Sequence, residues 1–144
     1  MLLRAFLQGM AITVVSLGAA FFVLYTGHWY FGQGLADDSR LYLEACTACW
    51  AGIMVGQGFN LIAQRSSTAH VFKKGFGGNK FIIPAYLSIM LAFIIAIYLP
   101  PVQDILYTRP FPIETWLVML CLAPLVLITD TLWKMVVAPR IKRQ

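Results

Sequence analysis

The sequence predicts an all-α membrane protein: one domain of four transmembrane helices in a bundle, with both termini in the cytoplasm. The composition, four long apolar segments and an uneven charge distribution lead to this prediction. Of the 144 residues, 60% are hydrophobic and 12% are charged, and the mean hydropathy is +0.75. A soluble domain carries about twice that fraction of charged residues. The chain is also too short to hold a soluble catalytic domain beside its spans.

The first two spans are predicted at residues 5–26 and 41–64. The first ends near Trp29 and Tyr30, aromatic residues that favour the membrane interface. It is longer than the apolar region of a signal peptide, and no small-x-small cleavage site closes it, so we expect it to be retained. The second is followed by a loop rich in Lys, Arg and Gly.

The third and fourth spans are predicted at residues 81–99 and 115–137. The proline pair at 100–101 ends the third span, because proline cannot continue a helix. A short loop is expected next. Trp116 and Trp133 bracket the fourth span, as interfacial aromatic residues do.

The basic residues are distributed unevenly over the two sides of this arrangement. Two of the eleven, Arg40 and Arg109, fall on one side, and the other nine fall on the opposite side. Lys and Arg are retained in cytoplasmic loops, so both termini should be cytoplasmic, in agreement with an even number of spans. A net charge of +5 grouped in this way argues against nucleic-acid binding. The nine residues are Arg4, Arg65, Lys73, Lys74, Lys80, Lys134, Arg140, Lys142 and Arg143.

Small residues recur every four positions in the second span, at Ala48, Gly52 and Gly56. They form one face on which another helix backbone can approach closely. We predict that this face is used for helix packing.

Three amide side chains, Gln57, Asn60 and Gln64, follow in the same span. At ~100° per residue they lie within about 60° of one another. An unpaired amide in hydrocarbon costs several kcal/mol, so this face should point at protein or at a hydrated cavity. Spacing leaves two interpretations open: hydrogen bonds between helices, or oxygens that line a cation or proton site.

Glu44 and Asp130 are the acidic residues placed within spans. Glu44 is near the outer end of its helix, where it can reach the interface. Asp130 precedes Lys134 by four residues, and an i,i+4 ion pair near the cytoplasmic interface is favoured over a role in a proton relay.

The cysteine pair at 46 and 49 has the spacing of a redox or metal motif, but no nearby His or second pair completes a site. With Cys121 also inside a span, no disulfide is predicted. The sequence has no Walker A, GxSxG or HExxH motif, and no cofactor is predicted.

The stretch "QGFNLIAQRSSTAHVFKKGFGGNKFIIPAYL" resembles the eighth span and following loop of P-type cation-transporting ATPases, of the branch that contains the calcium, sodium/potassium and proton/potassium pumps. In that family a polar, basic turn leads to an "S-x-F-x-x-G" element and then to "N-K". Here "AHVFKKG" and Asn79-Lys80 occupy these places, with Ala69 or His70 where the family has Ser.

Both ends of the chain extend the resemblance. "LLRAFLQGMAITVVSLGAAFFVLY" is similar to the seventh span. "PFPIETWLVMLCLAPLVLITDTLWKMV" is similar to the final span, which closes on aspartate, an acidic residue, two further residues and lysine. Asp130 and Lys134 match that pattern, whereas Thr131 replaces the second acidic residue.

The resemblance implies spans seven to ten of a pump, a module that supports the transport helices. It places Gln57 at a position whose side chain contributes to a cation site, with Asn60 beside it on the same face. Calcium pumps have glutamate at the first position and sodium/potassium pumps have glutamine, so the transported ion stays open. The implied partners are the lipid bilayer, the remaining spans and cytoplasmic domains of the pump, and the transported cation. The implied location is the plasma membrane.

The sequence also departs from a complete pump. It has no "DKTGT" phosphorylation motif and no nucleotide-binding domain, so we expect no ATPase activity from the chain alone. The chain would be a fragment, one polypeptide of a split pump or a free-standing relative. The alternative function is a non-catalytic membrane scaffold or regulator that associates through the small-residue face. A redox enzyme built on Cys46 and Cys49 is a more distant third.

Overall fold

The computed structural model describes residues 2–64 and 81–136 of the chain. The predicted all-α fold is confirmed, because within these ranges the structure has helices and no strand. The helices are α1 (Leu2–Thr26), α2 (Arg40–Gln64), α4 (Ile82–Tyr98), α5 (Pro100–Leu106), α6 (Glu114–Leu122) and α7 (Pro124–Val136).

Three helical segments are long and apolar enough to cross a membrane: Leu2–Thr26, Arg40–Gln64 and Glu114–Met135. The helix α4 has 17 residues. At 1.5 Å per residue it is about 25 Å long, less than the ~30 Å of a hydrocarbon core. It is followed by α5 at an angle of 89°. The described chain therefore has three candidate spans, or four if α4 and α5 form one bent span.

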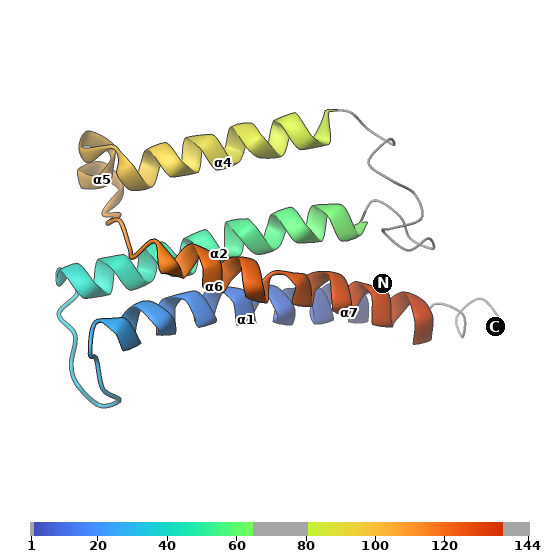
Figure 1. Cartoon of the computed structure of the whole chain (residues 1–144), viewed down its shortest axis with the longest axis horizontal. Helices are drawn as coiled ribbons and strands as arrows, with labels where there is room; N and C mark the ends of the chain where they lie inside the picture. Colours follow the sequence, from blue (N-terminus) through green and yellow to red (C-terminus); the bar gives the residue numbers. More distant parts are fainter. Residues whose placement is uncertain (1, 65–80, 137–144) are drawn as a thin grey trace.

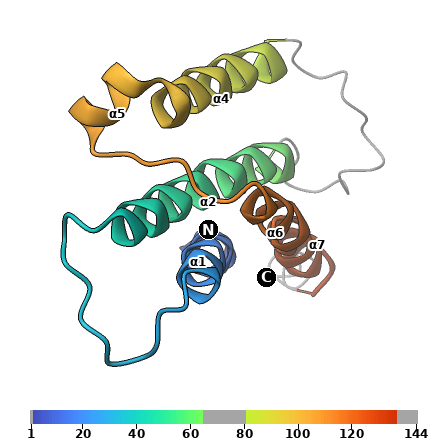
Figure 2. The same cartoon turned by 60° about the vertical axis from the view of Figure 1, so that its left-hand side comes forward.

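The central helix of the fold is α2, which contacts α1, α4, α6 and α7. The helices α6 and α7 follow one another nearly in line and pack beside α1 and α2, whereas α4 lies on another side of α2 (Figure 1, Figure 2). At one end of the bundle, α1 begins and both α2 and α7 end; we call this the terminal end (Figure 1). The helix α5 lies at the opposite end, which we call the turn end.

The proline pair at 100–101 both ends α4 and begins α5. Proline has no backbone N–H, so the carbonyls of Ala96 and Ile97, four residues earlier, lack their usual helical donors. The Thr108 hydroxyl donates to the Ala96 carbonyl at 2.8 Å, and the Gln103 amide donates to the Ile97 carbonyl at 2.6 Å. Proline is well suited to the first position of a helix. The expectation that a loop directly follows the third span was therefore wrong.

Pro124 separates α6 from α7. It cannot donate to the carbonyl of Leu120, four residues before it. The N–H of Ala123 donates to the Met119 carbonyl at 2.8 Å, so the helical path continues up to the break. The segment predicted as one span thus consists of two helices that meet at Ala123.

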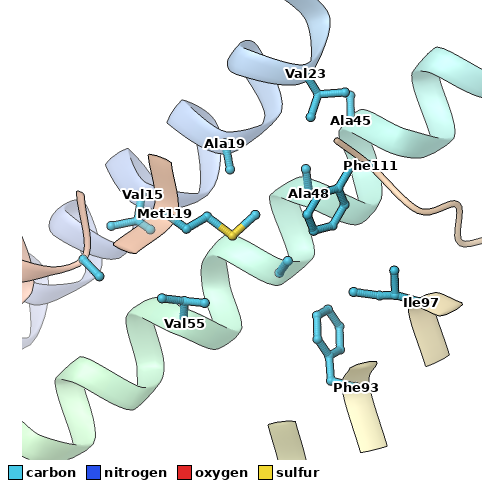
Figure 3. Close-up of a cluster of buried hydrophobic side chains, with 12 residues drawn as sticks. Val15, Ala19, Val23, Ala45, Ala48, Val55, Phe93, Ile97, Phe111 and Met119 are labelled. Carbon is cyan, nitrogen blue, oxygen red and sulfur yellow. The ribbon is translucent and has the colours of Figure 1, made fainter. Parts of the chain in front are cut away.

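The apolar core lies where α1, α2, α4 and α6 meet (Figure 3). On α1 its members are spaced four residues apart, which places them on one helical face toward α2. Most contributions from α2 are alanines, so the backbones can lie close together. The cluster comprises Val15, Ala19, Val23, Ala45, Ala48, Ala51, Val55, Phe93, Ile97, Phe111, Met119 and Ala123.

The two glycines of the predicted small-residue face lie against α1. A Cβ added at Gly52 would be 2.6 Å from the Cα of Ser16, and one added at Gly56 would be 3.1 Å from the side chain of Ile12. The Ser16 hydroxyl donates to the carbonyl of Cys49 at 3.0 Å across the same contact. The third member, Ala48, is fully buried in the core.

The helix α4 is joined to α2 by two aromatic contacts. Trp50 and Phe93 meet edge to face with ring centroids 4.5 Å apart. The Tyr86 hydroxyl donates to the Met54 carbonyl at 2.9 Å, where Gly58 leaves room for the ring.

Candidate functional site

The three amides of α2 form a hydrogen-bonded row, which we call the amide ladder (Gln57, Asn60 and Gln64). The Asn60 Nδ2 donates to the Gln57 Oε1 at 3.2 Å, and the Gln64 Nε2 donates to the Asn60 Oδ1 at 3.0 Å. Gln57 and Gln64 are exposed, and Asn60 is half-buried. A carbonyl oxygen has two lone pairs, so the acceptor oxygens of Gln57 and Asn60 can still take a second partner.

The amide ladder faces the space between α1 and α4. Gly56 points toward Ile12 of α1, and Gly58 lies against Tyr86 of α4. At ~100° per residue, the side chain between these two glycines points about midway between α1 and α4. The exposure of Gln57 follows from this position, because neither helix covers it.

An apolar pocket of about 300 Å³ lies between α1 and α2, nearer the turn end. One of its lining residues, Cys46, precedes Gln57 by eleven residues, about three helical turns, and so lies on the same face of α2. Cys46, Cys49 and Cys121 are free thiols, and the described residues contain no group of three or more His, Cys, Asp or Glu able to hold a metal ion. The pocket is lined by Leu17, Ala20, Phe21, Leu24, Leu35, Tyr42, Ala45, Cys46 and Cys49.

A buried group of charged and polar side chains lies at the terminal end of the bundle, and we call it the charge clamp (Arg4, Gln8, Asp130 and Lys134). Asp130 is 0% exposed. Its Oδ1 accepts from the Nε of Arg4 at 2.9 Å and from the Gln8 amide at 3.3 Å, and the Arg4 Nη2 lies 2.7 Å from the same oxygen. Its Oδ2 forms an ion pair with Lys134.

The charge clamp also reaches α2, because Lys134 Nζ donates to the carbonyl of Ala63 at 3.0 Å. It therefore connects α1, α2 and α7 through one carboxylate and two cations. Removing one partner of a buried ion pair costs about 3–5 kcal/mol, since the remaining charge is left uncompensated. Removing the Asp130 side chain would leave Arg4 and Lys134 without their shared counter-charge.

Sequence reasoning found the Asp130–Lys134 spacing but missed Arg4 and Gln8. Arg4 and Gln8 are four residues apart, as are Asp130 and Lys134. Each pair therefore presents its two side chains on one helical face. The predicted topology also placed residue 4 and residue 130 toward the same side of the membrane. Nothing in the sequence, however, gives the rotation of α1 relative to α7 that turns the two faces together.

The other acidic residue placed within a span, Glu44, lies in the first turns of α2 and accepts from the Nε of Arg40 at 2.6 Å. This is an i,i+4 pair at the turn end, with the Arg40 side chain 82% exposed. The loop residues that carry part of the predicted motif, Ala69, His70 and Asn79-Lys80, lie outside the described residues, as do the cationic residues after Val136.

These features define a helical membrane domain with an uncovered polar strip on its central helix and a buried ionic connection at one end. Residues 1–136 match the family described as "Cation transporting ATPase, C-terminus". The chain belongs to this family, the C-terminal membrane domain of cation-transporting P-type ATPases. This confirms the resemblance at the level of the family. A comparison with curated proteins found no match.

Proposed function

We propose that the chain supports the transport helices of a P-type cation pump and that its amide ladder faces the path of the cation. In this proposal both termini are cytoplasmic, the pump resides in the plasma membrane, and the chain alone does not hydrolyse ATP. The observation that carries the proposal is the exposure of Gln57, seven residues before the end of a helix long and apolar enough to span a membrane.

Amides exposed to hydrocarbon would be unfavourable by several kcal/mol, even though they bond partly to one another. In the membrane they must therefore face a second protein surface or a hydrated cavity that such a surface encloses. The remaining spans of the pump are the natural surface, because the family is the C-terminal part of such pumps. The apolar pocket near Cys46 lies on the same face of α2 and can receive apolar side chains from the helix that covers the ladder.

The ladder suits a cation for a chemical reason. Hard cations such as Ca²⁺ and Mg²⁺ take oxygen ligands, and amide carbonyls supply oxygen without fixed charge. The amide oxygens of Gln57 and Asn60 each accept one hydrogen bond within the ladder and keep a second lone pair for a cation. Two neutral oxygens make at most part of a coordination sphere, so the covering helices must supply the rest.

The test uses the pump assembled from this chain and the parts that carry the phosphorylation motif. Gln57→Ala and Asn60→Ala are compared with Ile53→Ala, an exposed apolar residue one turn earlier on α2. We expect each amide variant to raise about tenfold the cation concentration that half-saturates phosphorylation by ATP, because a hydrogen bond or ligand contact to a charged group contributes about 1.5–3 kcal/mol. The Ile53 variant should leave it unchanged. Unchanged cation dependence in both amide variants, at normal assembly, would overturn the cation role.

The scaffold alternative relies on self-association through the small-residue face. Gly52 and Gly56 lie against α1 of the same chain, so this face is already occupied. Self-association would have to use another surface. Cross-linking of the purified chain across a range of detergent-to-protein ratios separates the two functions, because a scaffold dimerises without any pump component.

A further inference from the structure

The last turn of α2, next to the amide ladder, is bound by a cation from another helix. The last four carbonyls of a helix lack intrahelical donors, and the C-terminal end of a helix carries partial negative charge. The last turn of α2 contains no basic residue. Lys134 of α7 places a cation at this end, since its buried Nζ donates to the Ala63 carbonyl at 3.0 Å.

The rest of the charge clamp fixes the position of the Lys134 side chain. Its ammonium lies between the Asp130 carboxylate and the end of α2. Asp130 is in turn held by Arg4 and Gln8 of α1. The last turn of α2 is therefore attached to α7 directly and to α1 through Asp130.

The attachment point is adjacent in the chain to the amide ladder. Ala63 directly precedes Gln64 and follows Asn60 by three residues. Ala63 is fully buried, whereas Gln64 is exposed on another side of the same turn. A rotation or fraying of this turn would move Gln64 away from Asn60 and break the 3.0 Å hydrogen bond between them.

We propose that Lys134 and Asp130 are positioning residues: through the carbonyl of Ala63 they hold the last turn of α2, and thereby the amide ladder, in the orientation that serves the cation. The inference rests on the proposed function for its consequence in transport, but the positioning itself is a property of this chain. Its test therefore has one arm that needs no pump.

The first arm uses the full chain in detergent with Cys46, Cys49 and Cys121 replaced by Ser and a reporter thiol introduced by Ile62→Cys, which leaves the amide ladder intact. Ile62 is half-buried, so its modification by a polar maleimide responds to movement of the last turn. We expect Lys134→Met to raise the modification rate at least fivefold and Lys134→Arg, which keeps a buried donor, to restore most of the protection. Glu44→Gln is the matched control, because it breaks an i,i+4 pair at the opposite end of the same helix.

Arg4→Gln gives a milder perturbation of the charge clamp if Lys134→Met does not fold. The Arg4 side chain is 20% exposed, so its loss leaves less uncompensated charge. This variant should raise the modification rate at least twofold. Unchanged rates in the folded variants would overturn the inference, as would an equal increase in the Glu44→Gln control.

The second arm uses the assembled pump. Lys134→Met should raise the half-saturating cation concentration several-fold when Gln57 and Asn60 are present, and should have no further effect in the Gln57→Ala, Asn60→Ala background. An equal effect in both backgrounds would overturn positioning through the ladder. Gln57→Ala and Asn60→Ala could leave the half-saturating cation concentration unchanged while Lys134→Met still raises the thiol modification rate. In that case the proposed function fails and the positioning of the last turn stands.

Discussion

Replacing Gly52 by alanine should force α1 and α2 apart. The added Cβ would lie 2.6 Å from the Ser16 Cα and 3.1 Å from the carbonyl oxygen of Val15, and ordinary contact for a Cβ begins at 3.4 Å. The nearest contact is therefore too short by about 0.8 Å. Both neighbours are backbone atoms, so a change of side-chain rotamer cannot relieve the overlap.

Overpacking of this kind typically destabilises a protein by about 1–3 kcal/mol. Alanine favours the helix by up to about 1 kcal/mol over glycine, which offsets part of the loss. We therefore expect a net destabilisation of about 1–2 kcal/mol, a factor of about 5–30 in the ratio of folded to unfolded protein. The hydrogen bond from Ser16 to the Cys49 carbonyl should weaken as the helices separate.

The assay is reversible unfolding of the full chain in mixed micelles, followed by tryptophan fluorescence. Gly9→Ala is the control, because a Cβ there meets no atom within 4 Å. It should be neutral or stabilising. Gly56→Ala should fall between the two, since its nearest neighbour is the Ile12 side chain at 3.1 Å. If Gly52→Ala is as stable as Gly9→Ala, the close backbone contact inferred for the two helices is wrong.

Two further predictions concern the attachment of α4 and α5. Thr108→Val keeps the shape of a buried side chain but leaves the Ala96 carbonyl without its donor, so the free energy of unfolding should fall by about 1–3 kcal/mol. The exposed Thr13, whose hydroxyl bonds within its own helix, is the control, and equal effects of the two Thr→Val changes would contradict the role given to Thr108. Tyr86→Phe removes the hydrogen bond to the Met54 carbonyl and should lower stability by about 0.6 kcal/mol, a typical value for hydrogen bonds between membrane helices. Tyr25→Phe, at a 79% exposed site, should have no effect, and an equally stable Tyr86→Phe variant would mean that the ring and not the hydroxyl carries the contact.

Sequence patterns predicted the structure well where the membrane limits the possible backbone conformations. Hydrocarbon leaves backbone groups no partner outside the chain, so long apolar segments must be helical, and the resulting all-α class is observed. The i,i+4 relation of Asp130 and Lys134 likewise predicted an ion pair, and this pair is present. Local spacing determines both features.

Prolines were harder to interpret from sequence. The pair at 100–101 does end α4, but it also begins α5, because the position that forbids one helix suits the first turn of the next. Pro124 interrupts the last span without ending it, since the helix resumes at once in nearly the same direction (Figure 1). Which outcome follows a proline depends on the donors that tertiary neighbours supply to the freed carbonyls.

The sequence by itself determined the family, the helical class and the presence of a polar strip on α2. Only the tertiary structure decided which side of that strip is uncovered and what holds its end. Arg4 meets Asp130 across 126 positions of the chain, and Lys134 meets the Ala63 carbonyl across 71. Such contacts depend on the rotation of each helix about its axis, and that rotation is set by how Gly52, Gly56 and the core side chains fit against α1. Periodicity along one helix contains no information about its neighbours, so the charge clamp could be recognised only after the helices were packed.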